Sequence, residues 1–187
     1  IIGTGYVGLV SGACFSDFGH NVVCFDKNIS KIEALNKNII PIFEPGLDLL
    51  VARNNKAGRI IFKTNLDEEI SSFDVIFIAV GTPTRRGDGH ADLSSIFSLC
   101  KDLKELLKPS QLIVIKSTVP IGTNKRVSEI LNSKKKVCEV ASNPEFLREG
   151  SALEDFMKPD RIILGVNSKS AETILREVYK PLYLREF

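Results

Sequence analysis

Short apolar runs alternate with helical patterns along the whole chain. The apolar runs are typical of strands buried on both faces, and we expect such strands at 1–2, 21–25, 59–63, 74–80, 112–116, 137–141 and 161–166. Helical periodicity or start signals separate them, and we expect helices at 6–18, from 30, and at 45–53, 66–71, 92–107, 123–131 and 169–179. This alternation indicates an α/β protein with a parallel sheet and right-handed crossovers.

Local signals set the expected helix ends. Ser30 and Glu33 have the spacing of a capping box, Asp92 and Thr123 are expected to cap the next two long helices, and Gly19 ends the first helix. The opening apolar stub is shorter than the roughly five residues of an ordinary strand, so we expect the chain to begin inside its first strand. Neither a repeat nor a linker interrupts the pattern, and residues 1–187 are expected to form one domain.

Charge and cysteine content exclude several classes of function. The net charge of +2 is too small for a nucleic-acid or membrane-binding surface, and the lysine run at 134–136 is better explained as a solvated loop than as a phosphate-binding patch. The cysteines form no CxxC pair and lie in apolar stretches, at Cys14, Cys24, Cys100 and Cys138. We therefore expect buried thiols, no metal site and a reducing, cytoplasmic location.

The first candidate site is a glycine motif at the start of the chain. Gly3-Thr4-Gly5-Tyr6-Val7-Gly8 has the spacing GxGxxG, follows the apolar stub and opens a helix. In a Rossmann unit the three glycines permit the tight turn, the approach of the pyrophosphate and close helix–strand packing, and the helix N-terminus attracts the phosphates. We therefore expect a doubly wound Rossmann fold with helices on both faces; a turn that needs glycines for geometry alone is the alternative.

Asp26 indicates which dinucleotide is bound. It ends the strand at 21–25 and follows Gly8 by 18 residues, close to the distance of about 20 residues at which the ribose-binding acid belongs. A carboxylate accepts hydrogen bonds from the ribose hydroxyls and repels a 2′-phosphate, which favours NAD over NADP. Lys27 and Lys31 lie near enough to weaken that repulsion.

Three polar loops follow the later strands. They are 81–84, 117–120 and 142–150, and all are rich in hydroxyls, glycine or proline. Ligands of open α/β sheets bind outside the carboxyl ends of the strands, so we expect the three loops to converge beside the glycine turn. Ordinary turn chemistry is the alternative explanation for each loop taken singly.

Glu145 and Thr118 are the candidate catalytic residues. Glu145 precedes the apolar Phe146 and Leu147, and desolvation there would raise its pKa toward that of a useful base. Thr118 could hold a water or a substrate hydroxyl. The alternatives are that Glu145 caps a short helix and that the Thr118 hydroxyl bonds its own turn.

These motifs together resemble the UDP-glucose/GDP-mannose dehydrogenase family. The resemblance rests on the glycine motif, Gly81-Thr82-Pro83-Thr84 with Asp88-Gly89 and Ala91-Asp92-Leu93, Lys116-Ser117-Thr118-Val119-Pro120, the loop 41–47, and Asn143 to Gly150. It covers nearly the whole chain. It implies a four-electron oxidation in which the C6 hydroxymethyl group of a nucleotide sugar becomes a carboxylate and two NAD are reduced.

The resemblance also implies roles for individual residues. The adenosine diphosphate half of NAD would contact Gly3, Thr4, Gly5, Tyr6, Val7, Gly8, Asp26 and Lys31, and the rest of the cofactor would contact Val80, Gly81, Thr82, Pro83, Thr84, Ser117, Thr118, Val119 and Glu149. The nucleotide sugar would contact Glu145, Phe146, Leu147, Arg148 and Glu149. Thr118 and Glu145 would position and activate water or move protons.

One feature of the family is missing from this chain. The family's nucleophilic cysteine, which forms a thiohemiacetal and then a thioester, lies beyond a long central helix, and none of the four cysteines has that context. The resemblance therefore implies an NAD-binding domain without the central helix and substrate domain, inactive alone, from an enzyme that forms homo-oligomers through that helix. UDP-glucose is the expected substrate, with GDP-mannose or a UDP-N-acetylhexosamine as alternatives and a non-catalytic dinucleotide-binding module as a remote one.

Overall fold

The computed structural model describes residues 1–133 and 137–184, so the lysine run at 134–136 lies outside the described residues. The strands are β1 (Val22–Phe25), β2 (Ile60–Lys63), β3 (Val75–Ile78), β4 (Leu112–Ile115) and β5 (Glu139–Ser142). The helices are α1 (Tyr6–Asp17), α2 (Ile29–Asn36), α3 (Leu47–Lys56), the 3-10 helix η1 (Glu68–Ser72), α4 (Ser94–Leu106), α5 (Thr123–Leu131), α6 (Ala152–Met157) and α7 (Lys169–Tyr183).

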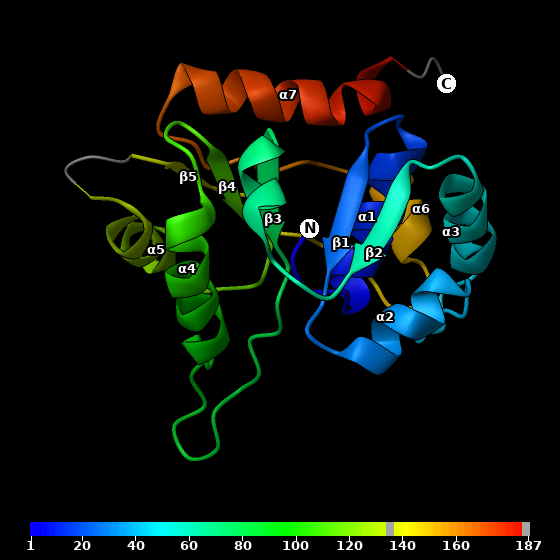
Figure 1. The fold of residues 1–187 in the computed structure, drawn as a ribbon, viewed down its shortest axis with the longest axis horizontal. Helices are drawn as coiled ribbons and strands as arrows, with labels where there is room; N and C mark the ends of the chain where they lie inside the picture. Colours follow the sequence, from blue (N-terminus) through cyan, green and yellow to red (C-terminus); the bar gives the residue numbers. More distant parts are fainter. Residues whose placement is uncertain (134–136, 185–187) are drawn as a thin grey trace.

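The start of the chain lies at the centre of the sheet. β1 pairs with β2, and β3, β4 and β5 pair in that order, all in parallel. Ile2 makes parallel bridges to Phe25 and to Ile78 and so joins the two groups of strands, as the position of the N-terminus between β1 and β3 shows (Figure 1). The chain runs outward on one side, returns to the centre at β3 and runs outward on the other, which is the doubly wound arrangement expected from the sequence.

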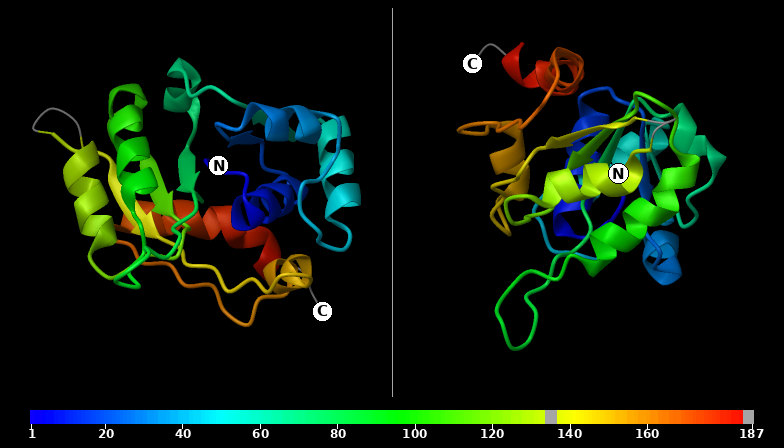
Figure 2. Two further views of the ribbon diagram at one scale, coloured as in Figure 1. Left: turned by 90° about the horizontal axis from the view of Figure 1, so that it is seen from below. Right: turned by 90° about the vertical axis from the view of Figure 1, so that its left-hand side faces the viewer.

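The strands are buried on both faces because each face carries its own apolar core. In β4, Leu112 and Val114 belong to the cluster formed with α1, α3 and α7, whereas Ile113 and Ile115 belong to the cluster formed with α4 and α5. Alternate side chains of a strand point to opposite faces, so a continuous apolar run satisfies both cores. The two sets of helices lie on opposite sides of the strands (Figure 2).

The expected strand at 161–166 is wrong. The structure has there a single antiparallel bridge between Ser142 and Gly165. The ladder stops because the next hydrogen-bonded pair would join residue 144 to Ile163, and Pro144 has no backbone N–H to donate. The Asn143 side-chain amide donates to Ile163 O at 3.0 Å instead. A side chain therefore replaces the next backbone bond that a strand would need.

Three expected helix caps also differ. α2 begins after Asn28, whose side chain accepts a hydrogen bond from the Lys31 N–H at 3.0 Å, because asparagine is at least as good an N-cap as the expected Ser30. Gly122 occupies the N-cap position of α5, one residue before Thr123. The N-cap of α4 is Leu93, and Asp92 just before it accepts from the Ser94 N–H at 2.9 Å.

Candidate functional site

The glycine turn has three different packing environments. A Cβ at Gly3 would lie 2.6 Å from the Ala79 carbonyl oxygen, and one at Gly8 would lie 1.8 Å from the Gly3 carbonyl oxygen, whereas one at Gly5 would meet no heavy atom within 4 Å. Gly3 also has φ +99°, where glycine is favoured. Gly3 and Gly8 thus close the turn, and Gly5 leaves the N-terminus of α1 open to an anion.

Asp26 lies directly beside this turn. Its Oδ2 accepts hydrogen bonds from the Thr4 N–H at 3.0 Å, the Thr4 hydroxyl at 2.7 Å and the Lys31 ammonium at 2.8 Å, and its Oδ1 accepts from the Asn28 N–H at 3.0 Å. Burial by itself would raise the pKa of the carboxyl group, but these donors lower it to about 2. Asp26 is therefore ionised at neutral pH, and Oδ1 retains acceptor capacity for a ribose hydroxyl.

A cleft of about 590 Å³ adjoins the turn and Asp26. Its lining includes Gly3, Gly5, Asp26 and Lys31, together with Val80 and Gly81 after β3. The open backbone at Gly5 and the ionised Asp26 are the groups that a dinucleotide requires, so the described residues fit NAD.

The sequence pattern did not indicate one wall of this cleft. Ser94, Ser95 and Ser98, in the first turns of α4, line it together with Thr64. The available signal was the serine cluster itself, which interrupts the apolar pattern at the start of that helix. These hydroxyls add donors and acceptors to the cleft that Asp26 also lines.

The loops that follow β3 and β4 are hydrogen-bonded to each other. The Thr82 hydroxyl donates to Thr118 O at 2.8 Å, and the Ser117 hydroxyl donates to Val80 O at 2.6 Å. Beyond Thr84, which bridges to Ala91, the chain extends away from the body of the molecule (Figure 1). The expected convergence of these two loops is therefore observed.

Thr118 and Glu145 occupy equivalent places on neighbouring strands. Ile115 and Ser142 are partners in the β4–β5 register, and each candidate residue follows its partner by three positions. The Thr118 side chain is exposed. Glu145 is half-buried and accepts a hydrogen bond from the Leu147 N–H at 2.6 Å. It caps no described helix, so the alternative of a helix cap for Glu145 is wrong.

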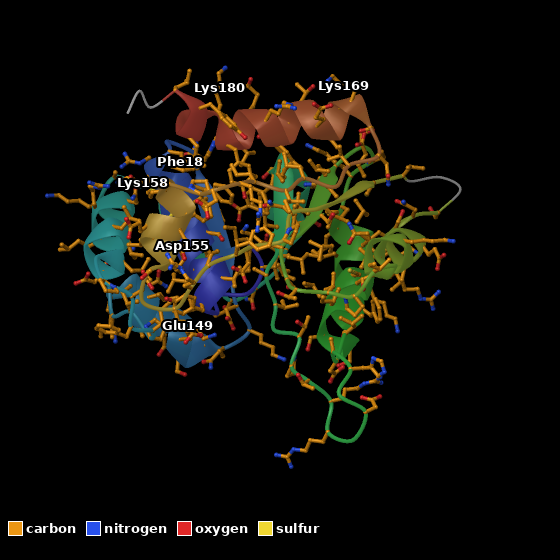
Figure 3. All side chains as sticks on the ribbon, turned by 180° about the vertical axis from the view of Figure 1, so that it is seen from behind. Phe18, Glu149, Asp155, Lys158, Lys169 and Lys180 are labelled. Carbon is orange, nitrogen blue, oxygen red and sulfur yellow. The ribbon has the colours of Figure 1, made fainter. Side chains whose placement is uncertain are left out.

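Residues 143–148 of the loop 142–150 line a second cleft of about 480 Å³, together with α6 and α7. Phe146 is 52% exposed, and the Arg161 guanidinium carbon lies 5.2 Å from its ring centroid. Arg148 pairs with Asp155 at 2.7 Å, and Glu149 is exposed, below Asp155 in the view from behind (Figure 3). The expected convergence of all three loops on one cleft is thus only partial, because Glu145 to Arg148 face a different cavity from Asp26.

Glu44 joins the loop 142–150 to the glycine turn. Its carboxylate is 6% exposed and accepts hydrogen bonds from the Tyr6 hydroxyl, the Gly150 N–H at 2.9 Å and the Leu153 N–H at 3.1 Å. The Gly150 N–H also lies 2.7 Å from the Tyr6 hydroxyl oxygen. Burial and the neighbouring carboxylate raise the pKa of Tyr6. No local sequence signal identifies Glu44, because its partners are far away along the chain.

Lys116 is a buried cation at the second cleft. Its ammonium lies 3.2 Å from Asn143 Oδ1, 3.5 Å from the Tyr179 hydroxyl and 5.7 Å from the centroid of the Phe156 ring. Burial lowers its pKa to about 8, against the opposing charge of Glu145. The Tyr179 hydroxyl donates to the same Asn143 oxygen at 2.5 Å, so this network ties the ends of β4 and β5 to α7.

The cysteines are all buried, as expected. Burial raises the pKa of the Cys24 thiol to about 11 and that of the Cys100 thiol to about 12, which disfavours the nucleophilic thiolate. Among the described residues, histidine, cysteine and carboxylate side chains form no group of three that could hold a metal ion. Within the same part of the chain, no helix has the length and apolar character needed to cross a membrane.

The comparisons with known proteins agree with this geometry. Residues 1–183 match the model of the UDP-glucose/GDP-mannose dehydrogenase family, NAD binding domain. The chain is 53% identical to the UDP-glucose 6-dehydrogenase of Rhizobium meliloti, covering 100% of this chain and 44% of that protein. Solved structures of a UDP-glucose dehydrogenase from Pyrobaculum islandicum and a GDP-mannose dehydrogenase from Pseudomonas aeruginosa superpose with TM-scores of 0.86 and 0.87 at 41% and 32% identity.

Coverage differs between the two sides of these comparisons. Each of the two superpositions covers 96% of this chain and 43% of the other. The chain thus spans less than half the length of the relatives it matches.

Proposed function

The chain belongs to the UDP-glucose/GDP-mannose dehydrogenase family as its NAD-binding domain, and from this we propose that it serves an enzyme that oxidises UDP-glucose to UDP-glucuronate. The overall change converts the C6 hydroxymethyl group and one water into a carboxylate, with four electrons passing to two NAD. We expect residues 1–187 to form one domain, and the central helix and substrate domain to lie in the remaining length of the enzyme. That helix would also pair the subunits.

The residues of this chain would hold the cofactor and orient it. The N-terminus of α1 at Gly5 and Tyr6 would bind the pyrophosphate, and Asp26 would accept the hydroxyls of the adenosine ribose. Val80 to Thr84 and Ser117 to Val119, which are hydrogen-bonded to each other, would line the nicotinamide half, with Glu149. When bound, NAD accepts the hydride that leaves C6.

The chain would also supply half of the catalytic groups. Thr118 and Glu145 would position a water and move protons at C6, and Glu145 to Glu149 would contact the nucleotide sugar. The thiol nucleophile would come from outside this chain, because the described cysteines are buried in the core of the domain.

The observation that carries the UDP-glucose assignment is the 53% identity over the whole chain to the Rhizobium enzyme. A substrate panel on the full-length polypeptide tests it. With UDP-glucose we expect two NADH for each sugar oxidised, and much slower NADH formation with GDP-mannose and UDP-N-acetylhexosamines. Preferential oxidation of either alternative would overturn the assignment.

A further inference from the structure

The Glu44 carboxylate connects two segments that the proposed function assigns to different ligands. Tyr6 lies in the first turn of α1, where the pyrophosphate of NAD would bind. Gly150 ends the loop that would contact the nucleotide sugar, and Leu153 lies in α6 just after it. Glu44 bonds all three from the segment between α2 and α3.

These bonds depend on one another because the carboxylate is nearly inaccessible to water. Hydrogen bonds to a charged acceptor are worth more than neutral ones, and a buried N–H that loses its partner costs free energy. A displacement of Tyr6 would therefore move the carboxylate that accepts from the Gly150 N–H. A displacement of Gly150 would likewise move the carboxylate that accepts from the Tyr6 hydroxyl. Gly150 also has φ +86°, a conformation that favours glycine.

We propose that Glu44 is a positioning residue that couples NAD binding to the conformation of the loop 142–150. NAD binding restrains the first turn of α1 and with it the Tyr6 hydroxyl. Because this hydroxyl donates to Glu44, the carboxylate is restrained as well, and so are the Gly150 and Leu153 amides that donate to it. The part that concerns the sugar rests on the proposed function. Binding of NAD and of the nucleotide sugar would then favour each other, equally in both directions.

Hydrogen exchange with NAD alone tests the coupling within this chain. The Leu153 amide is the reporter because its carboxylate acceptor is Glu44 and not Tyr6. In the wild type we expect saturating NAD to slow exchange at Leu153 by about fivefold or more, the lower end of typical coupling. In Tyr6→Phe the slow exchange without NAD should remain, but the NAD-dependent slowing should fall below about twofold.

A second variant and a control separate coupling from general destabilisation. Glu44→Gln should speed exchange at Leu153 with and without NAD. The glutamine amide has one acceptor oxygen, so it cannot accept hydrogen bonds at both of the positions where the carboxylate oxygens accept. Glu172→Gln carries the same substitution on α7, where Glu172 pairs with Lys169 and Arg176 at the surface, and should behave as the wild type. Full NAD-dependent slowing in Tyr6→Phe would overturn the proposal.

The full-length enzyme tests the sugar side. We expect saturating UDP-glucose to tighten NAD binding by about fivefold or more in the wild type and by less than about twofold in Glu44→Gln. An equal effect in both proteins would overturn the coupling role of Glu44. If the enzyme oxidises no nucleotide sugar, the proposed function fails, and the exchange measurement with NAD alone still decides the role of Glu44.

Discussion

The Lys31 ammonium lies 2.8 Å from Asp26 Oδ2 and neutralises part of the charge that would select NAD. Oδ1 of the same carboxylate accepts only the Asn28 N–H among the described contacts. Oδ2 is thus occupied by contacts within the protein, and Oδ1 can accept a hydrogen bond from a ribose hydroxyl. Asp26 is therefore both a structural acceptor beside the glycine turn and the expected ligand of the cofactor.

Asp26→Asn should weaken NAD binding while the fold stays intact. The amide cannot form the charge-assisted bonds to the ribose, which are worth about 1.5–3 kcal/mol each, so we expect affinity to fall by about tenfold or more. Isothermal calorimetry measures this directly. Asp48→Asn, an exposed position in the first turn of α3, is the matched control. Unchanged affinity in Asp26→Asn would refute the assignment.

The low pKa of Asp26 also predicts an acid-dependent loss of stability. The folded protein lowers this pKa from 3.8 to about 2, so the ionised carboxyl group stabilises the fold above about pH 4 and loses that contribution as the pH falls toward 2. By linkage the contribution is on the order of 2 kcal/mol. Urea unfolding of the wild type and Asp26→Asn at pH 5, 3 and 2 should show that the difference between their free energies of unfolding decreases as the pH falls. A difference that stays constant would contradict this prediction.

Gly5 and Gly8 give a matched pair of alanine substitutions. A Cβ at Gly8 would lie 1.8 Å from a backbone oxygen, so Gly8→Ala should destabilise the domain by about 2 kcal/mol or more through displacement of the turn. A Cβ at Gly5 meets open space, so Gly5→Ala should fold normally but bind NAD poorly, because its methyl group occupies the approach of the pyrophosphate. Thermal unfolding and calorimetry separate the two effects, and a reversed pattern would show that the turn does not face the cofactor.

Lys116→Met should stabilise the domain at neutral pH. Burial lowers the pKa of Lys116 from 10.5 to about 8, so the folded state carries a penalty that is fully present below pH 8 and is relieved as the pH rises toward 10.5. Methionine removes the buried charge, and the Tyr179–Asn143 bond remains. Allowing for the lost polar contacts, we expect a gain of about 1–3 kcal/mol at pH 7 that decreases by pH 9.5. Urea unfolding of both proteins at pH 7 and pH 9.5 measures this gain. A lower stability of Lys116→Met at pH 7 would contradict the prediction.

The sequence predicted those parts of the site in which local spacing defines the geometry. The glycine motif and Asp26 follow from a single strand–turn–helix–strand unit, and β1, β3 and β4 are recognisable because a strand buried on both faces must be apolar throughout. The same rule misassigned 161–166, because an apolar segment forms a strand only if a neighbouring edge offers it successive backbone partners. Asn143 uses its own side chain there instead.

Glu44 and Lys116 could not be found in this way. Glu44 acquires its role from Gly150, 106 positions away, and Lys116 from Tyr179, 63 positions away. Nothing within either local segment distinguishes a buried carboxylate or ammonium from a solvated one. The donors and acceptors that give these residues their interactions come from α1, α6, α7 and the loop 142–150, which only the folded chain brings together.

The isolated 187 residues should bind NAD and produce no NADH from UDP-glucose. The proposed chemistry needs a thiolate at C6, and Cys24 and Cys100 have pKa values raised by burial to about 11 and about 12, while Cys14 and Cys138 are also buried. Absorbance at the NADH band, with calorimetry on the same sample to verify NAD binding and the full-length enzyme as positive control, decides the matter. Turnover by the isolated chain would mean that one of these four thiols reaches the substrate, and the assignment of the nucleophile to the remaining length would be wrong.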